Sequence, residues 1–382
     1  MYITSIYLDN AATTPLSQKV KERLISLLYN FYNPSSAYQS GQEVGKIISD
    51  AREAVAKFIN ADSKNIYFTP SGSGSNTLAI KGMTSENPEE NQYEVFYSPT
   101  SHKSMLKACE SCIHHTALEV NQIGKIDLTY LDNILTRHNT WIPLVCIEAA
   151  NSEIGTINDI ISIGVVVHKH NGILIVDATG YIPYQQVDIR LWHEYVDILT
   201  FSGHKLHALK GIGVLWKRKG IELKPLIFGS QEQGLIGGTS NVLGIASLGE
   251  AVKNYNYSSI SSGNRDYVYE YIMKNIPDSC LIGASIESGN RLPQNLYICF
   301  KGIEGESLMI LLDMNGIQVS TGSACNSGNL SASATLSAIG IGEKDIHSCI
   351  RLTFSGRETT EELDYVNENL KYCVESLRKI NT

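Results

Sequence analysis

The stretch FSGHKLHALKGIGVLW, residues 201–216, joins an apolar run to a glycine-rich loop through a single lysine, Lys205. Residues 196–201 are rich in β-branched and aromatic side chains, which is typical of a buried strand. Lys205 therefore follows the point at which this strand ends. A lysine in a partly desolvated pocket has a lowered pKa and can bond to an aldehyde, whereas most lysines are solvated surface charges. Both interpretations remain open from this stretch alone.

Runs of the same kind alternate with helix-length segments over the first 250 residues. They are residues 65–69, 94–98, 142–148, 173–177, 196–202 and 213–217. Such alternation predicts an α/β fold with a mostly parallel sheet and covering helices. Ligands of these sheets bind beyond the carboxyl ends of the strands. Polar side chains follow several of the predicted ends, namely Ser71, Ser75, His102, Asn151, Asp177 and Lys205.

The composition changes after about residue 250. Residues 254–264, NYNYSSISSGN, are polar and predict a connector or an exposed helix end. Beyond them the chain has strand-like runs at 295–300 and 350–355, a helix-like segment between them, and an amphipathic helix from about Thr360. We therefore expect a large α/β domain over residues 16–250. A smaller α+β domain should combine residues 1–15 with residues 251–382.

Bulk composition excludes several classes of protein. The 382 residues are 43% hydrophobic and 18% charged, as in an ordinary globular protein, and the formal net charge is −8. This charge argues against direct, sequence-independent binding to nucleic acid. No run reaches the roughly 20 apolar residues of a membrane-spanning helix, and the first residues lack signal-peptide character. We expect a cytoplasmic protein whose eight cysteines are reduced thiols.

Two further segments suit a phosphorylated cofactor. PSGSGSN, residues 70–76, lies between a predicted strand and a predicted helix, where glycines and free N–H groups can bind a phosphate. A flexible turn is the alternative. IVDATG, residues 175–180, places Asp177 at a strand end, where its carboxylate could hold a cationic ring nitrogen or cap a helix. Asp177 and Lys205 together suit pyridoxal 5′-phosphate, with one residue for the ring nitrogen and one for the aldehyde.

Two cysteine-containing segments remain. STGSACNSG, residues 320–328, places Cys325 among small residues on an expected mobile, exposed loop, where a thiol can act as a nucleophile. CESCIHH, residues 109–115, lacks the second ligand pair of a zinc site and the setting of a thioredoxin-like redox motif. We expect Cys109 and Cys112 to be core residues and expect no metal site.

Taken together, these segments resemble the cysteine desulfurases, enzymes related to the class-V aminotransferases that depend on pyridoxal phosphate. The resemblance covers nearly the whole chain and implies the fold-type-I transferase architecture, with a seven-stranded, mostly parallel sheet in the large domain. The matching motifs are, in order, YLDNAATTP (7–15), NPSS (33–36), LAIKG (78–82), NSEIG (151–155), VDAT (176–179), FSGHK (201–205), KGIG (210–213), EGESL (304–308), STGSAC (320–325) and IRLTFS (350–355).

The resemblance implies a role for each residue around the cofactor. Lys205 should bind the aldehyde covalently, Asp177 should keep the pyridine nitrogen protonated, and His102 should stack on the ring. Asn151 should approach the phenolic oxygen. The implied phosphate-binding positions are Gly72, Ser73, Ser202, His204 and, reaching in from the partner subunit of a homodimer, Thr239.

The resemblance also implies the substrate and the reaction. Arg351 should clamp the carboxylate of L-cysteine, with Asn151 and Asn10 beside it. Lys205 should remove the Cα proton, and Cys325 should take the sulfur as a persulfide while L-alanine leaves. The sulfur would pass to an acceptor protein of iron–sulfur cluster assembly, tRNA thiolation or DNA phosphorothioation.

Four positions depart from the family pattern. Gly74, Gly180, Ile236 and Tyr38 stand where the family usually has a glutamate, a glutamine, an arginine and a histidine. These changes bear on cofactor affinity and rate. Two alternatives therefore remain beside the desulfurase: another pyridoxal phosphate-dependent lyase or aminotransferase that does not use Cys325, and a non-catalytic scaffold with the same fold.

Overall fold

The computed structural model describes residues 5–138, 140–321 and 333–380. Its larger part is built on a seven-stranded sheet of order β2-β8-β7-β6-β5-β3-β4. Its strands are β2 (Ile66–Thr69), β3 (Tyr93–Tyr97), β4 (His115–Ala117), β5 (Ile142–Glu148), β6 (Ile173–Asp177), β7 (Ile198–Ser202) and β8 (Gly213–Lys217). Strands β7, β6, β5, β3 and β4 are parallel, and β8 is antiparallel to β7 and β2. The predicted mostly parallel α/β sheet is confirmed, and β4 is a strand that the sequence did not predict.

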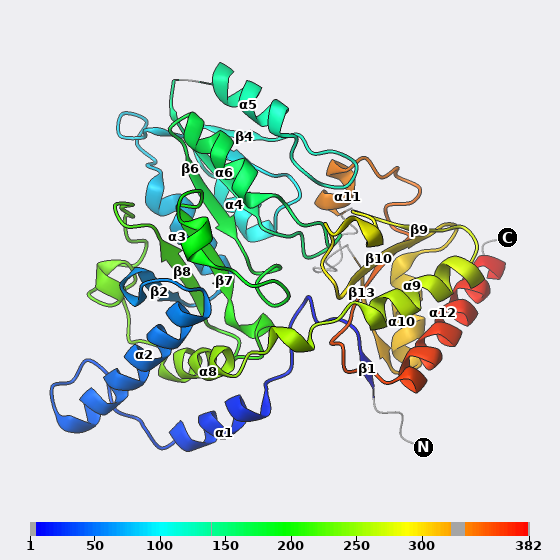
Figure 1. The fold of residues 1–382 in the computed structure, drawn as a ribbon, viewed down its shortest axis with the longest axis horizontal. Coiled ribbons are helices and arrows are strands. Elements are labelled where there is room, and N and C mark those ends of the chain that lie inside the picture. The colour runs from blue at the N-terminus through cyan, green and yellow to red at the C-terminus, as the bar shows by residue number, and fades with distance from the viewer. Residues whose placement is uncertain (1–4, 139, 322–332, 381–382) are drawn as a thin grey trace.

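Helices cover both faces of this sheet (Figure 1). The α-helices of the described chain, in both parts of the molecule, are α1 (Gln18–Leu27), α2 (Gln39–Phe58), α3 (Gly72–Met83), α4 (Lys103–Glu110), α5 (Leu128–Arg137), α6 (Ile160–Lys169), α7 (Ile189–Trp192), α8 (Val242–Lys253), α9 (Gly263–Asn275), α10 (Gly305–Met314), α11 (Ala334–Ala338) and α12 (Thr360–Ile380). Short 3-10 helices are η1 (Ser63–Asn65), η2 (Gly203–Lys205), η3 (Glu232–Gly234), η4 (Tyr257–Ser259) and η5 (Ile286–Ser288). Among the described residues, no helix combines the length and the apolar character needed to cross a membrane.

Alternation along the strands divides the core into two layers. Val145 and Ile147 of β5 pack in the layer that contains α2, α6 and α8, whereas Leu144 and Cys146 pack in the layer that contains α3 and α4. Because side chains alternate across a sheet, Glu148 continues the second series. The same alternation places Asp177 on the α3 and α4 side. The two carboxylates at the ends of β5 and β6 therefore face the same pair of helices.

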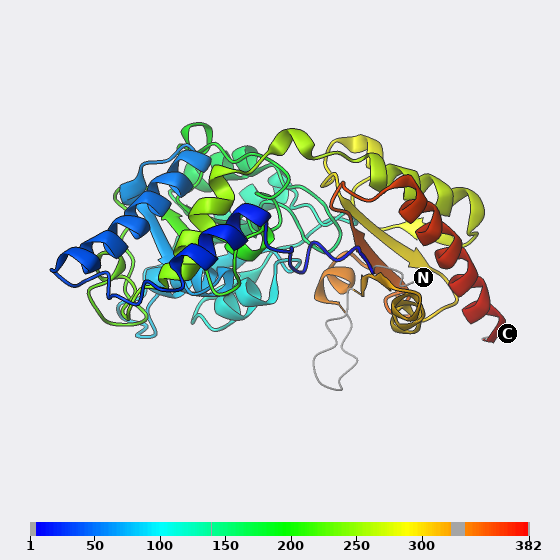
Figure 2. The same cartoon turned by 90° about the horizontal axis from the view of Figure 1, so that it is seen from below.

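A smaller part of the molecule lies beside the first (Figures 1 and 2). It has an antiparallel sheet of order β12-β13-β10-β9 and a parallel pair of β1 with β11. The strands are β1 (Ile6–Tyr7), β9 (Ser279–Leu281), β10 (Asn295–Phe300), β11 (Ile317–Gln318), β12 (Ser320–Thr321) and β13 (Cys349–Thr353). Helices α9, α10 and α12 contribute to its separate apolar core. The chain therefore begins in this smaller part, with β1, and crosses to the larger part before α1 begins.

The polar connector is held more tightly than its composition suggests. The hydroxyl of Tyr255 donates to the carbonyl of Pro183 at 2.6 Å, and that of Tyr257 donates to the carbonyl of Ile182 at 2.7 Å. Tyr257 also stacks on Phe58 of α2, with ring centroids 5.7 Å apart. The two tyrosines therefore hold the start of the connector against α2 and against the turn that follows β6. The domain division at residues 16–250 against 1–15 and 251–382 stays a prediction, which the two sheets and their separate cores support.

The first residue of β8 offers a test of this packing. A Cβ on Gly213 would lie 2.3 Å from the carbonyl carbon of Ser71, the residue that caps α3. Gly213→Ala should therefore force the strand and the start of α3 apart and lower the free energy of unfolding by roughly 1–3 kcal/mol. A thermal melt would measure the loss. Gly342→Ala is the matched control, because nothing lies within 4 Å of a Cβ there; equal melting temperatures for the two variants would contradict the packing argument.

Candidate active site

Lys205 ends the 3-10 turn that follows β7 and lines a cavity of about 1260 Å³. Burial is the main cause that lowers the pKa of Lys205 below its ordinary value, and the positive charge of Arg351 adds to it. The negative charges of Asp177 and Glu148 oppose this shift. A lowered pKa increases the share of neutral amine, the form that bonds to an aldehyde. The cavity is therefore a suitable place for the chemistry predicted at Lys205.

The start of α3 forms one wall of the cavity, and Gly72 and Ser73 line it. The hydroxyl oxygen of Ser71 caps this helix by accepting from the N–H of Gly74 at 3.0 Å. Remaining N–H groups of the first turn, with the positive end of the helix dipole, suit an anion. Ser202 and His204 line the same cavity. The predicted phosphate-binding residues of one chain are thus brought together.

His204 enters this site as a neutral ring. Burial, followed by the charges of Lys205 and Lys210, lowers the pKa of His204 to about 4. Its Nδ1 lies 3.1 Å from the hydroxyl of Thr13. A neutral imidazole offers a hydrogen bond to a phosphate and no positive charge.

Asp177 is held by donors from two other elements. Its Oδ2 accepts from Asn76 Nδ2 at 2.7 Å, and its Oδ1 accepts from the N–H of Thr179 at 2.8 Å. Asn76 is itself fixed, because its Oδ1 accepts from the hydroxyl of Thr200 at 2.5 Å. Asp177 is only 3% exposed and forms no ion pair with any of the described residues. A buried carboxylate of this kind suits a cationic partner such as a protonated ring nitrogen.

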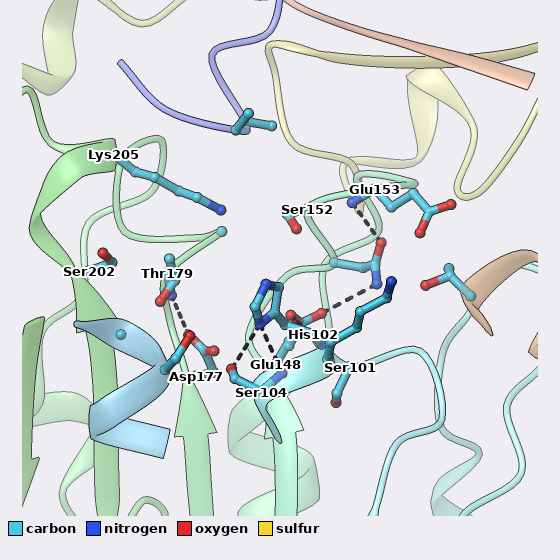
Figure 3. A pocket seen from close by; sticks show the side chains of 18 of the residues that line it. Ser101, His102, Ser104, Glu148, Ser152, Glu153, Asp177, Thr179, Ser202 and Lys205 are labelled. Carbon is cyan, nitrogen blue, oxygen red and sulfur yellow. Dashed lines mark hydrogen bonds between the residues drawn. The ribbon is translucent and has the colours of Figure 1, made fainter. Parts of the chain in front are cut away.

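His102 and Asn151 line the same cavity as Lys205, and Figure 3 shows His102 beside Ser104 and Glu148. His102 caps α4 with its Nδ1, which accepts from the N–H of Ser104 at 3.2 Å. Burial and the charge of Lys205 lower the pKa of His102, against the opposing effect of Asp177. Asn151 Oδ1 accepts from the N–H of Glu153 at 2.9 Å, which leaves its amide nitrogen to donate. The ring of His102 and the amide of Asn151 therefore line the same cavity, and the amide nitrogen donates to the carbonyl of Thr100 at 2.6 Å and to Glu148 Oε2 at 3.3 Å.

Arg351 reaches the cavity from β13 of the smaller sheet. Its Nη2 pairs with Asp9 Oδ1 at 2.8 Å, and its Nη1 donates to the carbonyl of Ser152 at 3.1 Å. Its Nε is buried and has no hydrogen-bond partner among the described residues. A free donor on a mostly buried guanidinium suits an incoming carboxylate, which would share Arg351 with Asp9.

Two predicted site residues of the described chain, Asn10 and Thr239, do not line this cavity. The amide of Asn10 donates to the carbonyl of Thr353 at 2.8 Å, so this side chain has a structural contact and its substrate role stays a prediction. Thr239 is exposed and is not among the residues that line the cavity of its own chain. Cys325 lies outside the described residues. The predicted roles of Thr239 and Cys325 stay predictions.

The sequence missed four residues of the site. Asn76 and Thr200 support Asp177, Glu148 contacts both His102 and Asn151, and Glu153 accepts from the hydroxyl of Ser333 at 2.6 Å. Only Glu148 gave a signal, as a charged residue that ends the otherwise uncharged strand β5. Asn76 and Thr200 are 124 residues apart, so no local pattern joins them.

Of the four departures from the family pattern, the one at Gly180 changes the wall of the cavity. A Cβ on Gly180 would lie 2.7 Å from the carbonyl oxygen of Ala150, so no side chain fits there without moving the backbone. Gly74 lies in the first turn of α3, Ile236 is half-buried near η3, and Tyr38 precedes α2. Gly180 alone of these four lines the cavity.

The cysteine-rich segment is part of the core, as expected. Cys109 and Cys112 are buried, and burial raises the pKa of the Cys112 thiol. Among the residues that the structure describes, no cluster of three or more His, Cys, Asp or Glu side chains is placed to hold a metal ion.

The residues present fit pyridoxal phosphate. Lys205 suits the aldehyde, the start of α3 suits the phosphate, and Asp177 is a buried carboxylate with hydrogen-bond donors and no ionic partner among the described residues. These groups line one cavity.

Comparison with known proteins agrees with this chemistry. The family model for class-V aminotransferases matches residues 6–366. A cysteine desulfurase of Nostoc sp. is 36% identical, with 98% of this chain and 94% of that protein covered. The cysteine desulfurase IscS of Dictyoglomus turgidum is also 36% identical, with 98% and 96% covered.

Solved structures show the same similarity. A NifS-like protein from Rickettsia africae superposes with a TM-score of 0.86 at 28% identity, covering 97% of this chain and 99% of that chain. A protein named SspA, solved in complex with cysteine, superposes with a TM-score of 0.79 at 29% identity, covering 93% of this chain and 100% of that chain. The fold-type-I architecture and the family resemblance that the sequence predicted are confirmed.

The support that Asn76 gives to Asp177 can be tested directly. Asn76→Leu should raise the Kd for pyridoxal phosphate about tenfold, because a hydrogen bond to a charged group contributes on the order of 1.5 kcal/mol or more. Titration of the cofactor, followed by its visible absorbance, measures the change. Asn367→Leu is the control, since Asn367 is buried in α12 with its side chain unpaired among the described residues. An unchanged Kd in Asn76→Leu would contradict the role.

Proposed function

The chain belongs to the class-V aminotransferase family and, within it, to the cysteine desulfurases, and from this premise we propose that it converts L-cysteine to L-alanine and transfers the sulfur to Cys325. The observation that carries the proposal is one cavity lined by Lys205, Asp177, His102 and Arg351, which come from four separate segments. The similar structure solved with cysteine supports the choice of substrate.

The cofactor of this enzyme is pyridoxal phosphate, which supplies an electron sink when it is bound. We propose that the amine of Lys205 holds its aldehyde and that the carboxylate of Asp177 holds its ring nitrogen. The start of α3, with Ser73, would bind the phosphate, together with Ser202. His102 and Asn151, which line the same cavity, would border the ring. All of these residues line the same cavity, which supports these assignments.

The chain's own groups account for substrate binding and proton movement. Arg351 would receive the carboxylate of L-cysteine through its unpaired Nε and by sharing its Nη2 with Asp9. Once the amino group of L-cysteine has replaced Lys205 on the aldehyde, the freed Nζ of Lys205 would accept the proton from the substrate's Cα. Its lowered pKa favours the neutral amine, which is the form that can accept.

The sulfur step balances without an external oxidant or reductant. The sulfur atom of Cys325, as a thiolate, forms a bond to the sulfur of the substrate, and the substrate's C–S bond breaks. Cys325 then carries a persulfide, and the carbon skeleton takes up a proton and leaves as alanine. The net change moves one sulfur atom from free cysteine to Cys325.

We assign the acceptor of this sulfur to a protein. Suitable acceptors belong to iron–sulfur cluster assembly, tRNA thiolation or DNA phosphorothioation. A chain with a formal net charge of −8 is repelled by nucleic acid, which favours a protein intermediary. The seven described cysteines are free thiols, which suits the reducing cytoplasm that we propose as its location.

We propose that the enzyme acts as a homodimer. Large apolar side chains are exposed on the end of α1, on the segment after it and on the loop before η3, at one end of the molecule (Figures 1 and 2). They are Ile25, Leu28, Tyr29, Phe31, Ile227 and Phe228, with Tyr29, Phe31 and Phe228 each at least 84% exposed. Exposed apolar surface of this kind marks an interface. Thr239 is exposed on the same loop region, so a second copy covering this surface could receive it in its own cavity.

The catalytic proposal predicts distinct behaviour for two variants. Lys205→Ala should lose the visible absorbance band of the bound cofactor, and Cys325→Ser should keep this band but release no alanine from L-cysteine. Absorbance and alanine quantification measure the two outcomes. Cys280→Ser, which removes a partly exposed thiol of β9, should retain both.

Other results would favour the alternatives. Undiminished alanine release by Cys325→Ser would favour another pyridoxal phosphate-dependent lyase or aminotransferase. Absence of the band in the wild-type protein, even with added cofactor, would leave the non-catalytic scaffold.

The dimer proposal predicts a change of mass. Phe228→Asp should place a charge on the apolar surface and convert the dimer to a monomer, with weaker cofactor binding if Thr239 acts across the interface. Light scattering after size-exclusion chromatography measures the mass. Tyr372→Asp on α12 is the matched control, because Tyr372 is 68% exposed elsewhere on the chain. A wild-type monomer would contradict the proposal.

A further inference from the structure

Glu148 is a buried acid that the reaction described above does not use. It ends β5, pairs in register with Asp177 at the end of β6, and is only 7% exposed. Every other residue of β5 is uncharged. Because burying a carboxyl group is costly unless it is hydrogen-bonded, its two oxygen atoms should have specific partners.

Both oxygens accept from groups that border the cavity (Figure 3). Oε1 accepts from the backbone N–H of His102 at 3.0 Å, and Oε2 accepts from Asn151 Nδ2 at 3.3 Å. The same Nδ2 also donates to the carbonyl of Thr100 at 2.6 Å. One carboxyl group thus joins the start of α4 to the turn that follows β5. These are the two segments whose side chains are expected to meet the cofactor ring.

Asn151 cannot exchange its amide oxygen and nitrogen to suit a changed neighbour. Its Oδ1 already accepts from the N–H groups of Glu153, at 2.9 Å, and Ile154, at 2.8 Å. Its Nδ2 must therefore point toward Thr100 and Glu148. A proton on Glu148 Oε2 would place an O–H against this N–H donor and weaken the contact.

The surroundings of Glu148 raise the pKa of its carboxyl group into the range of pH in which an enzyme works. Burial, and then the negative charge of Asp177, raises the pKa of Glu148 to about 8. The charged and titratable groups on the elements around it are Asp177 of β6, Glu153 in the turn after β5, Lys205 of η2 and His102 at the start of α4. Lys205 and the His102 N–H oppose the shift, whereas Glu153 adds to it.

We propose that Glu148 is a positioning residue of the desulfurase site, whose ionised carboxylate holds the His102 backbone and the Asn151 amide in the arrangement that the reaction needs. The proposal rests on the proposed function. Gly180 increases the importance of Asn151, because the wall formed by Gly180 has no room for a side chain. Protonation weakens the contact between Glu148 and Asn151, so the position of the Asn151 amide depends on pH.

The variant Glu148→Gln separates this role from a merely structural one. A glutamine keeps the size of the side chain and can accept from the His102 N–H, but it places an NH₂ group against Asn151 Nδ2. It therefore reproduces the protonated state at every pH. Glu148→Met removes both contacts at similar volume. Glu94→Gln is the matched control, since Glu94 is 8% exposed at the other end of the neighbouring strand β3 and contacts Thr116 and His138.

We expect kcat of the wild-type holoenzyme to rise between about pH 6.5 and about pH 9.5, with a midpoint near the pKa of Glu148. In Glu148→Gln this rise should be absent, and kcat at the upper end should be about tenfold lower than in the wild type, because Asn151 is misplaced. KM for cysteine should change less, since Arg351 is untouched. Glu148→Met should lose the same rise, and Glu94→Gln should keep it.

Two measurements do not depend on turnover. The visible band of the bound cofactor should change with pH near the pKa of Glu148 in the wild type and stay constant there in Glu148→Gln. The stability of the cofactor-free chain should change in the opposite direction to activity. A raised carboxyl pKa stabilises the fold below the unfolded pKa, and this contribution falls progressively from about pH 4.5 and is fully lost above about pH 8. Glu148→Gln should therefore melt at a higher temperature than the wild type by a margin that grows over this range and is largest at the alkaline end.

A wild-type pH profile shared by Glu148→Gln, in both kcat and the cofactor band, would overturn the proposal. An equal loss in Glu94→Gln would overturn it as well, because any buried acid would then have the same effect. Failure of the proposed function looks different. The wild type would then release no alanine, while the cofactor band and the melting temperature would still report on Glu148.

Discussion

A buried carboxylate needs hydrogen-bond donors, and the way Asp177 obtains them determines the arrangement of the whole site. Its donors come from Asn76 on α3 and from the backbone of Thr179 after β6. Asn76 must in turn accept from Thr200 of β7. Helix α3 is therefore fixed over the carboxyl ends of two strands, and its first turn is brought to the cavity wall. One buried charge thus sets the position of the expected phosphate site as well as that of the ring.

The first residues of the chain contact both Arg351 and the turn that carries Lys205. Asp9 pairs with Arg351 of the smaller sheet, and Ala11 donates its N–H to the hydroxyl of Thr353 at 2.9 Å. A few residues later, the N–H and the hydroxyl of Thr14 donate to the carbonyl of His204, beside Lys205, at 3.1 and 2.8 Å. This short segment therefore spans from Arg351, to which we assign substrate binding, to the turn that carries Lys205 (Figure 2). Its position explains why a stretch far from Lys205 in sequence carries one of the family's motifs.

The sequence predicted the strands around the site because each is a short, β-branched run, and it predicted Lys205 and Asp177 because each follows such a run. It could not predict the partners of these residues. The Asn76–Thr200 pair and the Glu148–His102 contact form only after the sheet and helices pack, so no spacing in the chain encodes them. The connector lies between α8 and α9, as the sequence predicted, but its anchoring could not be predicted, since the hydroxyls of Tyr255 and Tyr257 find carbonyl partners about 70 residues away.

Glu148 and Asp177, the carboxyl groups at the ends of β5 and β6, have different surroundings although they belong to neighbouring strands of one sheet. In-register pairing of parallel strands places Glu148 and Asp177 side by side on the same face, where the negative charge of Asp177 adds to the effect of burial on the pKa of Glu148. Asp177 receives donors at 2.7 and 2.8 Å, whereas the donors to Glu148 lie at 3.0 and 3.3 Å. Burial, and then the charge of Asp177, raises the pKa of Glu148 to about 8, near the pH at which thiols also lose their protons. A site that must hold a thiolate and a neutral amine together therefore has, in its own wall, an acid that loses its proton over the same range.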